Sequence, residues 1–255
     1  MTILVFATRQ LQCWMAEGCR ALEALVFPWV CPICEQPGVD SPFCESCRND
    51  LVNASGLVCE RCAMPLGPWS NQVGGCFECR GRPLGFDAAI ALGPYEGTIR
   101  DLCLRLKRES NAWLAPWLAK VLVDARAEVR QVPADSWVVP IPLHWRRQWQ
   151  RGYNQADALA RGISKRLSLR LAHPLRRVRS TPHLASAGRS ERAKVMREVF
   201  EVRRRQALGG RTVLLVDDIL TTGATCGAAA RALKRAGAAR VVVLVIGRAE
   251  GIPLK

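Results

Sequence analysis

The segment "VLLVDDILTTGAT", from Val213 to Thr225, indicates both the fold and the function of this chain. Its first part is a continuous apolar run that ends in two adjacent carboxylates, as expected for a strand buried on both faces of a parallel sheet. The run is followed by a Thr- and Gly-rich turn and by an alanine-rich helical pattern that ends at Gly237. Because ligands bind outside the carboxyl ends of such strands, at least one of Asp217 and Asp218 is expected to face a ligand.

The turn after the acid pair has the chemistry of an anion site. Its hydroxyl groups, exposed backbone N–H groups and positive helix-dipole end suit a phosphate. The residues are Thr221, Thr222, Gly223, Ala224 and Thr225. Carboxylates accept hydrogen bonds from sugar hydroxyls, so the acid pair and the turn together match a ribose 5-phosphate. A Walker A loop is excluded because no Lys follows the glycine, and the dinucleotide fingerprint GxGxxG is absent. The plain alternative is an acidic strand end beside a capping threonine.

Helical and strand patterns alternate from Phe86 onward, which predicts an α/β domain with a parallel sheet. Strands are expected at "SWVVPIP" and "RVVVLVIG". Three helices are indicated by apolar residues at helical spacing, namely Ile99, Leu102, Cys103 and Leu106; Trp113, Trp117, Val121 and Leu122; and Ala156, Leu159, Ala160 and Ile163.

Eight of the 12 cysteines form four CxxC pairs. The pairs are Cys31/Cys34, Cys44/Cys47, Cys59/Cys62 and Cys76/Cys79. Two thiolates at this spacing bind one metal ion in a tight turn, and two such turns complete a tetrahedral four-cysteine zinc site. Sequential pairing gives two structural zinc ribbons, and crossed pairing is the open alternative. A cytosolic chain is not expected to keep so many disulfides, which favours zinc over redox chemistry.

The cysteine pattern also suggests the domain organisation. We expect an N-terminal helix within residues 1–27, a double zinc ribbon over 28–85 and the α/β domain over 86–255. The remaining cysteines are expected to be small buried apolar residues. They are Cys13, Cys19, Cys103 and Cys226.

The net charge of +15 is concentrated in one part of the chain. Between His144 and Arg211 there are 18 Lys and Arg residues and 4 acidic residues. This excess indicates an anionic partner, either nucleic acid or a phosphorylated small molecule, with a solvated basic surface as the alternative. The apolar runs are far shorter than the roughly 20 residues of a membrane helix, and no signal peptide is evident, so a cytoplasmic protein without membrane insertion is expected.

Taken together, these motifs resemble the ComF/GntX family of competence-associated proteins. The segment 213–225 is similar to the phosphoribosyl pyrophosphate (PRPP) signature of type I phosphoribosyltransferases. The motifs that carry the resemblance, in order, are the four CxxC pairs, "YEGTIRDLCLRLK", "VVPIPLHWRRQWQRGYNQADALA", "STPH", "SERAKVMREVF" and "LLVDDILTTGAT". The resemblance covers residues 27–250. It implies a type I phosphoribosyltransferase-like parallel sheet flanked by helices, behind a small Cys-rich double zinc-ribbon module.

The resemblance also implies roles for individual residues. Asp217 and Asp218 would hold the ribose 2- and 3-hydroxyls, and the turn 221–225 would bind the 5-phosphate. The pyrophosphate loop would contain Leu143, His144, Arg146, Arg147, Arg151 and Asn154. A flap over 179–197 would contribute Arg189, Arg192, Lys194 and Arg197. The chain departs from the family at His183, where a Gln is usual after "TP", and at "RESNA", where a Gly often follows "LK".

These residues favour a transferase with an unidentified acceptor. PRPP is highly anionic, so its binding needs cations near both ends and usually Mg²⁺ shared by pyrophosphate and ribose oxygens. The transition state at C1 is expected to resemble an oxocarbenium ion, so leaving-group stabilisation and water exclusion would dominate catalysis. No residue stands out as a general base. The sequence therefore predicts the donor site and leaves the acceptor open, with nucleobase salvage as one alternative.

The second hypothesis is single-stranded DNA handling, with PRPP as a remnant or regulator. The resemblance to competence proteins implies this function and a helicase partner. In "HWRRQWQRGY", Arg146 and Arg147 lie between Trp145 and Trp149, so the arginines would contact phosphates while bases stack on the rings. The alternative is that the tryptophans pack under the zinc module and the arginines serve PRPP.

Overall fold

The structure is a computed structural model that describes residues 29–38, 41–54, 56–67, 74–143, 152–178, 199–203 and 208–249. The chain divides into two compact units, Met1–Asp50 and Leu51–Lys255. In the first unit, strands β1 (Trp29–Val30) and β2 (Pro37–Gly38) pair antiparallel around the first CxxC turn. Helix α2 (Glu45–Val52) carries the end of the second CxxC turn and stops just after the division. The second CxxC quartet therefore lies in the same unit as the predicted α/β domain.

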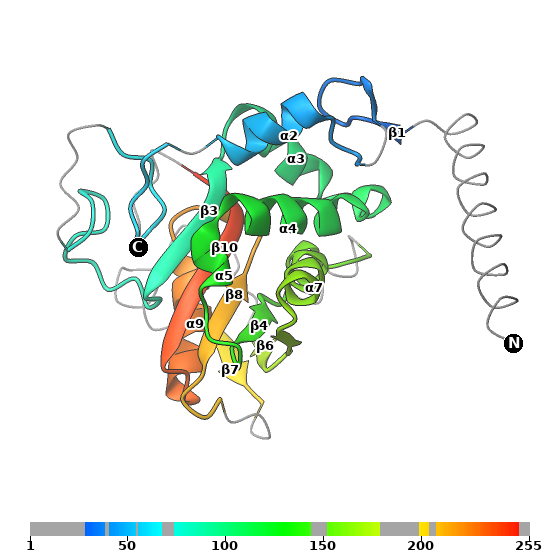
Figure 1. The fold of residues 1–255 in the computed structure, drawn as a ribbon. Coiled ribbons are helices and arrows are strands. Elements are labelled where there is room, and N and C mark those ends of the chain that lie inside the picture. Colours follow the sequence, from blue (N-terminus) through cyan, green and yellow to red (C-terminus); the bar gives the residue numbers. More distant parts are fainter. Residues whose placement is uncertain are drawn as a thin grey trace, which may run out of the picture. The chain divides into compact units, whose positions relative to one another are not determined.

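The second unit is built on a six-stranded sheet, drawn in Figure 1. The strands, in sheet order, are β3 (Ala88–Pro94), β10 (Arg240–Arg248), β8 (Thr212–Val216), β4 (Trp137–Pro140) and β5 (Arg170–Leu171). All four of these pairings are parallel, as the sequence predicts. The short strand β9 (Ile219–Leu220) follows β8 and pairs in parallel with the carboxyl end of β10.

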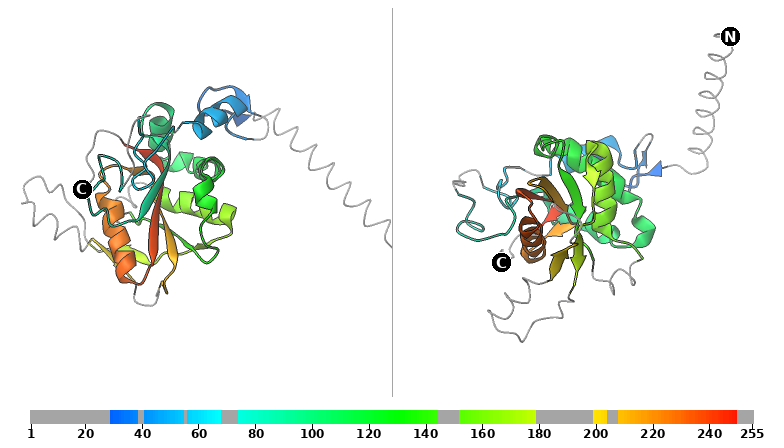
Figure 2. Two further views of the ribbon diagram at one scale, coloured as in Figure 1. Left: turned by 60° about the vertical axis from the view of Figure 1, so that its left-hand side comes forward. Right: turned by 90° about the horizontal axis from the view of Figure 1, so that it is seen from below.

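Helices cover both faces of this sheet, as Figures 1 and 2 show. Helix α9 (Ala224–Arg235) lies on one face, and α4 (Leu114–Ala125) and α7 (Gln155–Leu167) pack together on the other. The remaining elements are α3 (Gly97–Arg105), the 3₁₀ turn η1 (Glu109–Asn111), α5 (Ala127–Arg130), and the antiparallel pair β6 (Leu175–Arg177) and β7 (Phe200–Val202).

The two covered faces explain the continuous apolar run of β8. Val213 and Leu215 pack in one cluster with Ala229 of α9. Because side chains alternate along a strand, Leu214 and Val216 point to the opposite face, and both are also buried. A strand of a one-sided sheet would alternate apolar and polar residues, so the uninterrupted run is a consequence of burial on both sides.

The helical periodicities are confirmed except at the two tryptophans of the second predicted helix, of which Trp117 is only partly buried. Ile99, Leu102, Cys103 and Leu106 are buried, as are all four predicted core residues of α7. In the second predicted helix, however, Trp113 is 40% exposed and lies just before the helix, which begins at Leu114. Leu114 and Leu118 take the buried positions that the prediction gave to the tryptophans. The predicted helix within residues 1–27, with Cys13 and Cys19, lies outside the described residues.

Candidate functional site

The backbone of β10 holds the acid pair at the carboxyl edge of the sheet. The Asp217 N–H donates to the Leu244 carbonyl at 3.0 Å. The Asp218 carbonyl accepts from the N–H groups of Ile246 and Gly247 at 3.0 and 3.1 Å. Both acidic residues keep some solvent-exposed surface, although the Asp217 carboxyl group itself is largely removed from water. The predicted location of the acid pair is therefore confirmed, whereas the role of each carboxylate stays a prediction.

The Asp217 carboxyl group is turned toward the first turn of α9. One oxygen, Oδ1, accepts from the Asp218 N–H at 2.9 Å, and Oδ2 lies 4.0 Å from the Cys226 Sγ. Removal from water, followed by the adjacent negative charge of Asp218, raises the pKa of Asp217 well above its ordinary value. Asp217 therefore holds its proton more strongly than an exposed aspartate does, which lowers the repulsion between the two acids.

The turn between the acid pair and α9 is the candidate anion site, and it has free backbone donors. Gly223 precedes the helix at φ 70°, a left-handed conformation that glycine adopts without steric strain, and no side chain caps the helix. The first intrahelical bond runs from the Gly227 N–H to the Gly223 carbonyl at 2.7 Å. The Ala224 N–H reaches only the Thr222 Oγ1, at 3.4 Å. The amides of the first helical turn, including that of Thr225, are therefore available to an anion.

Only the two ends of the predicted pyrophosphate loop are described, Leu143 and Asn154. The Asn154 side chain donates from Nδ2 to the Ile141 carbonyl at 3.0 Å and accepts at Oδ1 from the Ala156 N–H at 3.0 Å. It therefore joins the end of β4 to the N-terminus of α7. In this conformation both polar atoms of Asn154 serve the backbone, so its effect on a ligand would be to fix the base of the loop.

Several predicted site residues lie outside the described residues. They are His144, Arg146, Arg147 and Arg151 of the loop, Trp145 and Trp149 of the proposed DNA-contacting stretch, and Arg189, Arg192, Lys194 and Arg197 of the flap.

The eight CxxC cysteines form two compact clusters, one from Cys31, Cys34, Cys44 and Cys47 and one from Cys59, Cys62, Cys76 and Cys79. Within each cluster the four Sγ atoms lie within 4.8 Å of one another. The Sγ atoms of Cys34 and Cys44 are 3.5 Å apart, as are those of Cys62 and Cys76. Tetrahedral coordination with Zn–S bonds of about 2.3 Å separates the sulfurs by about 3.8 Å. Both clusters thus fit structural zinc, with sequential and not crossed pairing.

One thiol in each cluster has a lowered pKa, whereas burial raises the pKa of Cys47, Cys62 and Cys79. Burial raises the pKa of the Cys31 and Cys59 thiols, but hydrogen bonds from nearby backbone groups outweigh this effect and lower both values to about 7. The fully buried Cys103 and the nearly buried Cys226 have raised pKa values because of burial. Those two cysteines are therefore small apolar residues, as predicted.

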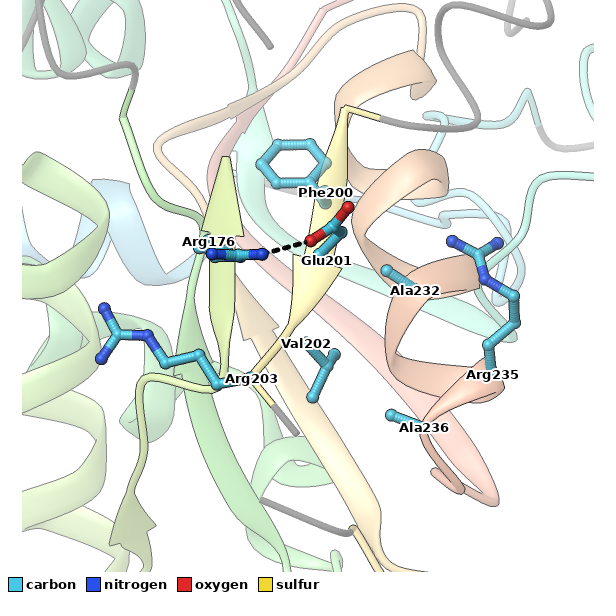
Figure 3. A pocket seen from close by; sticks show the side chains of 8 residues that line it. All are labelled: Arg176, Phe200, Glu201, Val202, Arg203, Ala232, Arg235 and Ala236. Carbon is cyan, nitrogen blue, oxygen red and sulfur yellow. Dashed lines mark hydrogen bonds and ion pairs between the residues drawn. The ribbon is translucent and has the colours of Figure 1, made fainter. Parts of the chain in front are cut away.

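A second hollow lies beside the other end of α9, shown in Figure 3. It has a volume of about 700 Å³ and is lined by Arg176, Phe200, Glu201, Val202, Arg203, Ala232, Arg235 and Ala236. The Arg176 guanidinium reaches Glu201 at 2.6 Å. Its α9 residues lie 8 to 12 positions after Ala224, so the hollow is about 12–18 Å along the helix from the candidate anion site. We call it the basic groove, because three arginines and only one carboxylate line it.

The sequence analysis missed one buried residue beside the anion site, Arg248 at the end of β10. The only local signal was a cation that ends a long apolar strand.

Fold and site together define an α/β domain of the phosphoribosyl transferase type behind two four-cysteine ribbons. The family model described as "Phosphoribosyl transferase domain" matches residues 154–253, which include the acid pair and the anion site. The model described as "Double zinc ribbon domain" matches residues 22–80.

Relatives extend the similarity to most of the chain. "Competence protein F" of Haemophilus influenzae is 27% identical over 221 residues, which are 81% of this chain and 96% of that protein. "DNA utilization protein YhgH" of Salmonella typhi is 28% identical over 230 residues, or 88% of this chain and 99% of the relative. Over most of its length the chain is thus similar to proteins named for competence and DNA utilization, in agreement with the resemblance that its motifs indicate.

The likeness to solved structures is weaker. The glutamine phosphoribosylpyrophosphate amidotransferase of B. subtilis, complexed with ADP and GMP, aligns with a TM-score of 0.38 at 20% identity, covering 53% of this chain and 26% of that one. In the described part of the chain, no helix is long and apolar enough to cross a membrane.

Proposed function

We propose that this protein binds a ribose 5-phosphate, in the form of PRPP, at the carboxyl edge of its sheet. The observation that carries the proposal is the acid pair at the end of β8, followed after two residues by the turn at the uncapped N-terminus of α9. Carboxylates match sugar hydroxyls, and amide donors with a positive dipole match a phosphate. The phosphoribosyl transferase match over residues 154–253 supports the same ligand class.

Each part of the site has a separate task in this proposal. Asp218 accepts hydrogen bonds from the ribose hydroxyls, and Asp217, with its raised pKa, shares a proton with them or gives it up when a cation binds. The hydroxyls of Thr221, Thr222 and Thr225 and the first amides of α9 hold the 5-phosphate. Mg²⁺ bound with PRPP would neutralise the pyrophosphate and connect it to the ribose oxygens.

We infer that the chemistry is transfer of the phosphoribosyl group to an acceptor that is not yet known. Departure of pyrophosphate from C1 leaves positive charge on the sugar, so the loop over 143–154 and the flap over 179–197 would stabilise the leaving group and exclude water. A non-catalytic regulatory role for PRPP is the alternative. A screen of nucleobases and other acceptors for pyrophosphate release separates the two, because a regulatory ligand is bound and recovered unchanged.

Calorimetry with PRPP and Mg²⁺ tests the binding proposal. We expect the Asp217→Asn/Asp218→Asn variant to lose at least about a hundredfold in affinity, because two charge-assisted hydrogen bonds are removed. The matched control is Asp101→Asn, an acid on α3 whose side chain is 67% exposed. The proposal is wrong if the wild-type protein gives no binding heat at millimolar PRPP, or if the double variant binds as the wild type does.

The basic groove favours a second function, binding of single-stranded DNA. Its three arginines lie outside the sugar-phosphate site, and the names of the relatives refer to competence and DNA utilization. A protein that handles incoming single strands would act in the cytoplasm beside a helicase. Such binding depends on phosphate contacts and weakens steeply with salt.

Substitutions in the groove distinguish this function from PRPP binding. Arg203→Gln/Arg235→Gln should lower the affinity for an oligothymidylate and reduce the slope of log K against log salt concentration by about 1.4, while PRPP binding stays unchanged. Arg100→Gln, on the exposed face of α3, is the control. An unchanged salt slope in the groove variant would reject the groove as a DNA site.

A further inference from the structure

Arg248 connects the second zinc ribbon to the anion site. Its side chain is fully buried at the carboxyl end of β10. Nε donates to the Cys62 carbonyl at 3.0 Å, within the second cysteine cluster. Nη1 donates to the Leu220 and Thr221 carbonyls at 3.0 and 2.9 Å, and also to the Ala249 carbonyl. One guanidinium thus joins a zinc-binding turn to the first residue of the phosphate-binding turn.

The charge of Arg248 has no carboxylate partner at hydrogen-bond distance among the described residues. Its acceptors there are all backbone carbonyls, and its Nη2 is buried without a hydrogen-bond partner. A buried cation in such a position is costly unless negative charge lies nearby. Four thiolates around one Zn²⁺ carry a net charge of −2, and the carbonyl that accepts from Arg248 Nε belongs to one of these ligands, Cys62. The loaded ribbon therefore supplies the counter-charge.

A second contact joins the same two regions. Leu84 and Gly85, in the segment that leaves the ribbon, lie against the first turn of α9 at Gly227. A Cβ atom on Gly227 would lie 2.3 Å from the Leu84 carbonyl oxygen, and one on Gly85 would lie 2.6 Å from the Gly227 carbonyl oxygen. The backbones therefore touch where α9 begins, a few residues after the phosphate-binding turn.

We propose that Arg248 is a positioning residue through which the zinc-loaded second ribbon holds the phosphate-binding turn in its binding conformation. The proposal extends the proposed function, because it concerns the same turn. The second ribbon then has a role beyond its own folding: it keeps the Thr221 and Leu220 carbonyls directed at Arg248, and the free amides that follow directed at the ligand. Loss of zinc from this ribbon loosens the turn.

Hydrogen–deuterium exchange of the full chain tests the coupling without any ligand. In the wild-type protein, removal of zinc with a strong chelator should accelerate exchange in residues 219–226 by at least about tenfold, at labelling times at which the strands β3 and β8 are still protected. A variant that lacks only the first zinc site, Cys31→Ser/Cys34→Ser, should protect the turn as the wild type does before chelation. Unchanged exchange of the turn after zinc removal overturns the proposal.

Three arginine substitutions separate the charge of Arg248 from its geometry. Arg248→Lys keeps the charge but cannot reach the Cys62 and Thr221 carbonyls together, so zinc should be retained while the turn loses protection. Arg248→Met should lose both the zinc and the protection of the turn, and it should release zinc from the second ribbon at least about tenfold faster than the wild type does. The matched control is Arg126→Met, because Arg126 also donates to backbone carbonyls, those of Ala91 and Leu92 in β3. The proposal is wrong if Arg126→Met reproduces the effects, or if Arg248→Lys protects the turn as the wild type does.

PRPP affinity supplies the last readout. If the wild type binds PRPP, Arg248→Lys should weaken binding about tenfold. Chelation of zinc from the Arg248→Lys variant should then weaken binding only slightly more, because both changes act through the same contact. Full additivity of the two effects contradicts the proposal. If the wild type binds no PRPP, the proposed function fails, and the exchange experiment still decides whether Arg248 couples the ribbon to the turn. Should a variant fail to fold, chelation of the wild-type protein decides alone.

Discussion

The two zinc ribbons of this protein contain the same ligands in different surroundings. In the first, Cys34 is exposed and Cys44 is partly buried, and the ribbon belongs to the compact unit that ends at Asp50. In the second, all four cysteines are buried within the same core cluster as the sheet strands. Equal coordination chemistry therefore serves a module of its own in one case and the phosphoribosyl transferase-type domain in the other. Burial and long-range contacts make the difference.

The largest expected difference follows from removal of one ligand from each ribbon. Cys76→Ser should lower the free energy of unfolding of the sheet unit by at least about 3 kcal/mol, because it removes a buried metal ligand from the core. Cys34→Ser should change the free energy of unfolding of that unit by less than about 0.5 kcal/mol. Thermal unfolding followed by circular dichroism measures both, and equal losses would contradict the distinction between the ribbons.

A smaller effect is expected where the second ribbon's exit segment meets α9. Gly227→Ala places a Cβ 2.3 Å from the Leu84 carbonyl oxygen, so backbone has to move, and we expect a loss of about 1–3 kcal/mol. Gly56→Ala is the control, because a Cβ there meets nothing within 4 Å. Urea denaturation of both variants measures the difference. A neutral Gly227→Ala would mean that the two backbones are not in firm contact.

Substitution of Asp217 should stabilise the unit that contains the second ribbon, and the gain in the free energy of unfolding should depend on pH. The pKa of Asp217 is raised in the folded protein, so its contribution to stability is fully present below the ordinary aspartate pKa and is lost as the pH rises toward the folded value. Asp217→Asn cannot ionise. Without PRPP or Mg²⁺, the free energy of unfolding of Asp217→Asn should therefore exceed that of the wild type by about 1 kcal/mol at pH 8. At pH 4 the two proteins should have similar free energies of unfolding.

Denaturation at the two pH values measures this difference. The same offset at pH 4 and pH 8 would show that the substitution acts through packing and not through the proton. The first ribbon's unit contains no matching acid pair among its described residues, so no such pH-dependent gain is expected from substitutions there.

The smallest effect is expected at Phe77, the neighbour of Cys76 in the second ribbon. Its side chain is 92% exposed, so Phe77→Ser should change the free energy of unfolding by less than about 0.5 kcal/mol. Differential scanning calorimetry of Phe77→Ser and Cys76→Ser compares the stability effects of two adjacent residues in one turn. A large loss at Phe77 would mean that the whole ribbon, and not only its ligands, is tied to the core.

Much of the candidate site was predictable because its parts are contiguous in the sequence. The end of β8, the acid pair, the turn and the start of α9 all lie within residues 213–225, and strand and helix periodicities are local signals. The prediction failed at Trp113, where helical spacing alone did not define which side of the helix meets the sheet. Asn154 was predicted as part of the pyrophosphate loop, and its N-cap role at α7 depends on the neighbouring Ile141 carbonyl as well.

The sequence by itself determined the parallel α/β class, the position of the acid pair and the eight cysteine metal ligands, because each follows from spacing over a few residues. Tertiary structure decided which CxxC turns pair, how Asp217 is turned and why Arg248 is buried. Arg248 bonds to Cys62, 186 positions earlier, and to Leu220, 28 positions earlier. Such contacts depend on the order of the strands in the sheet and on what packs against it, and no local pattern contains that information.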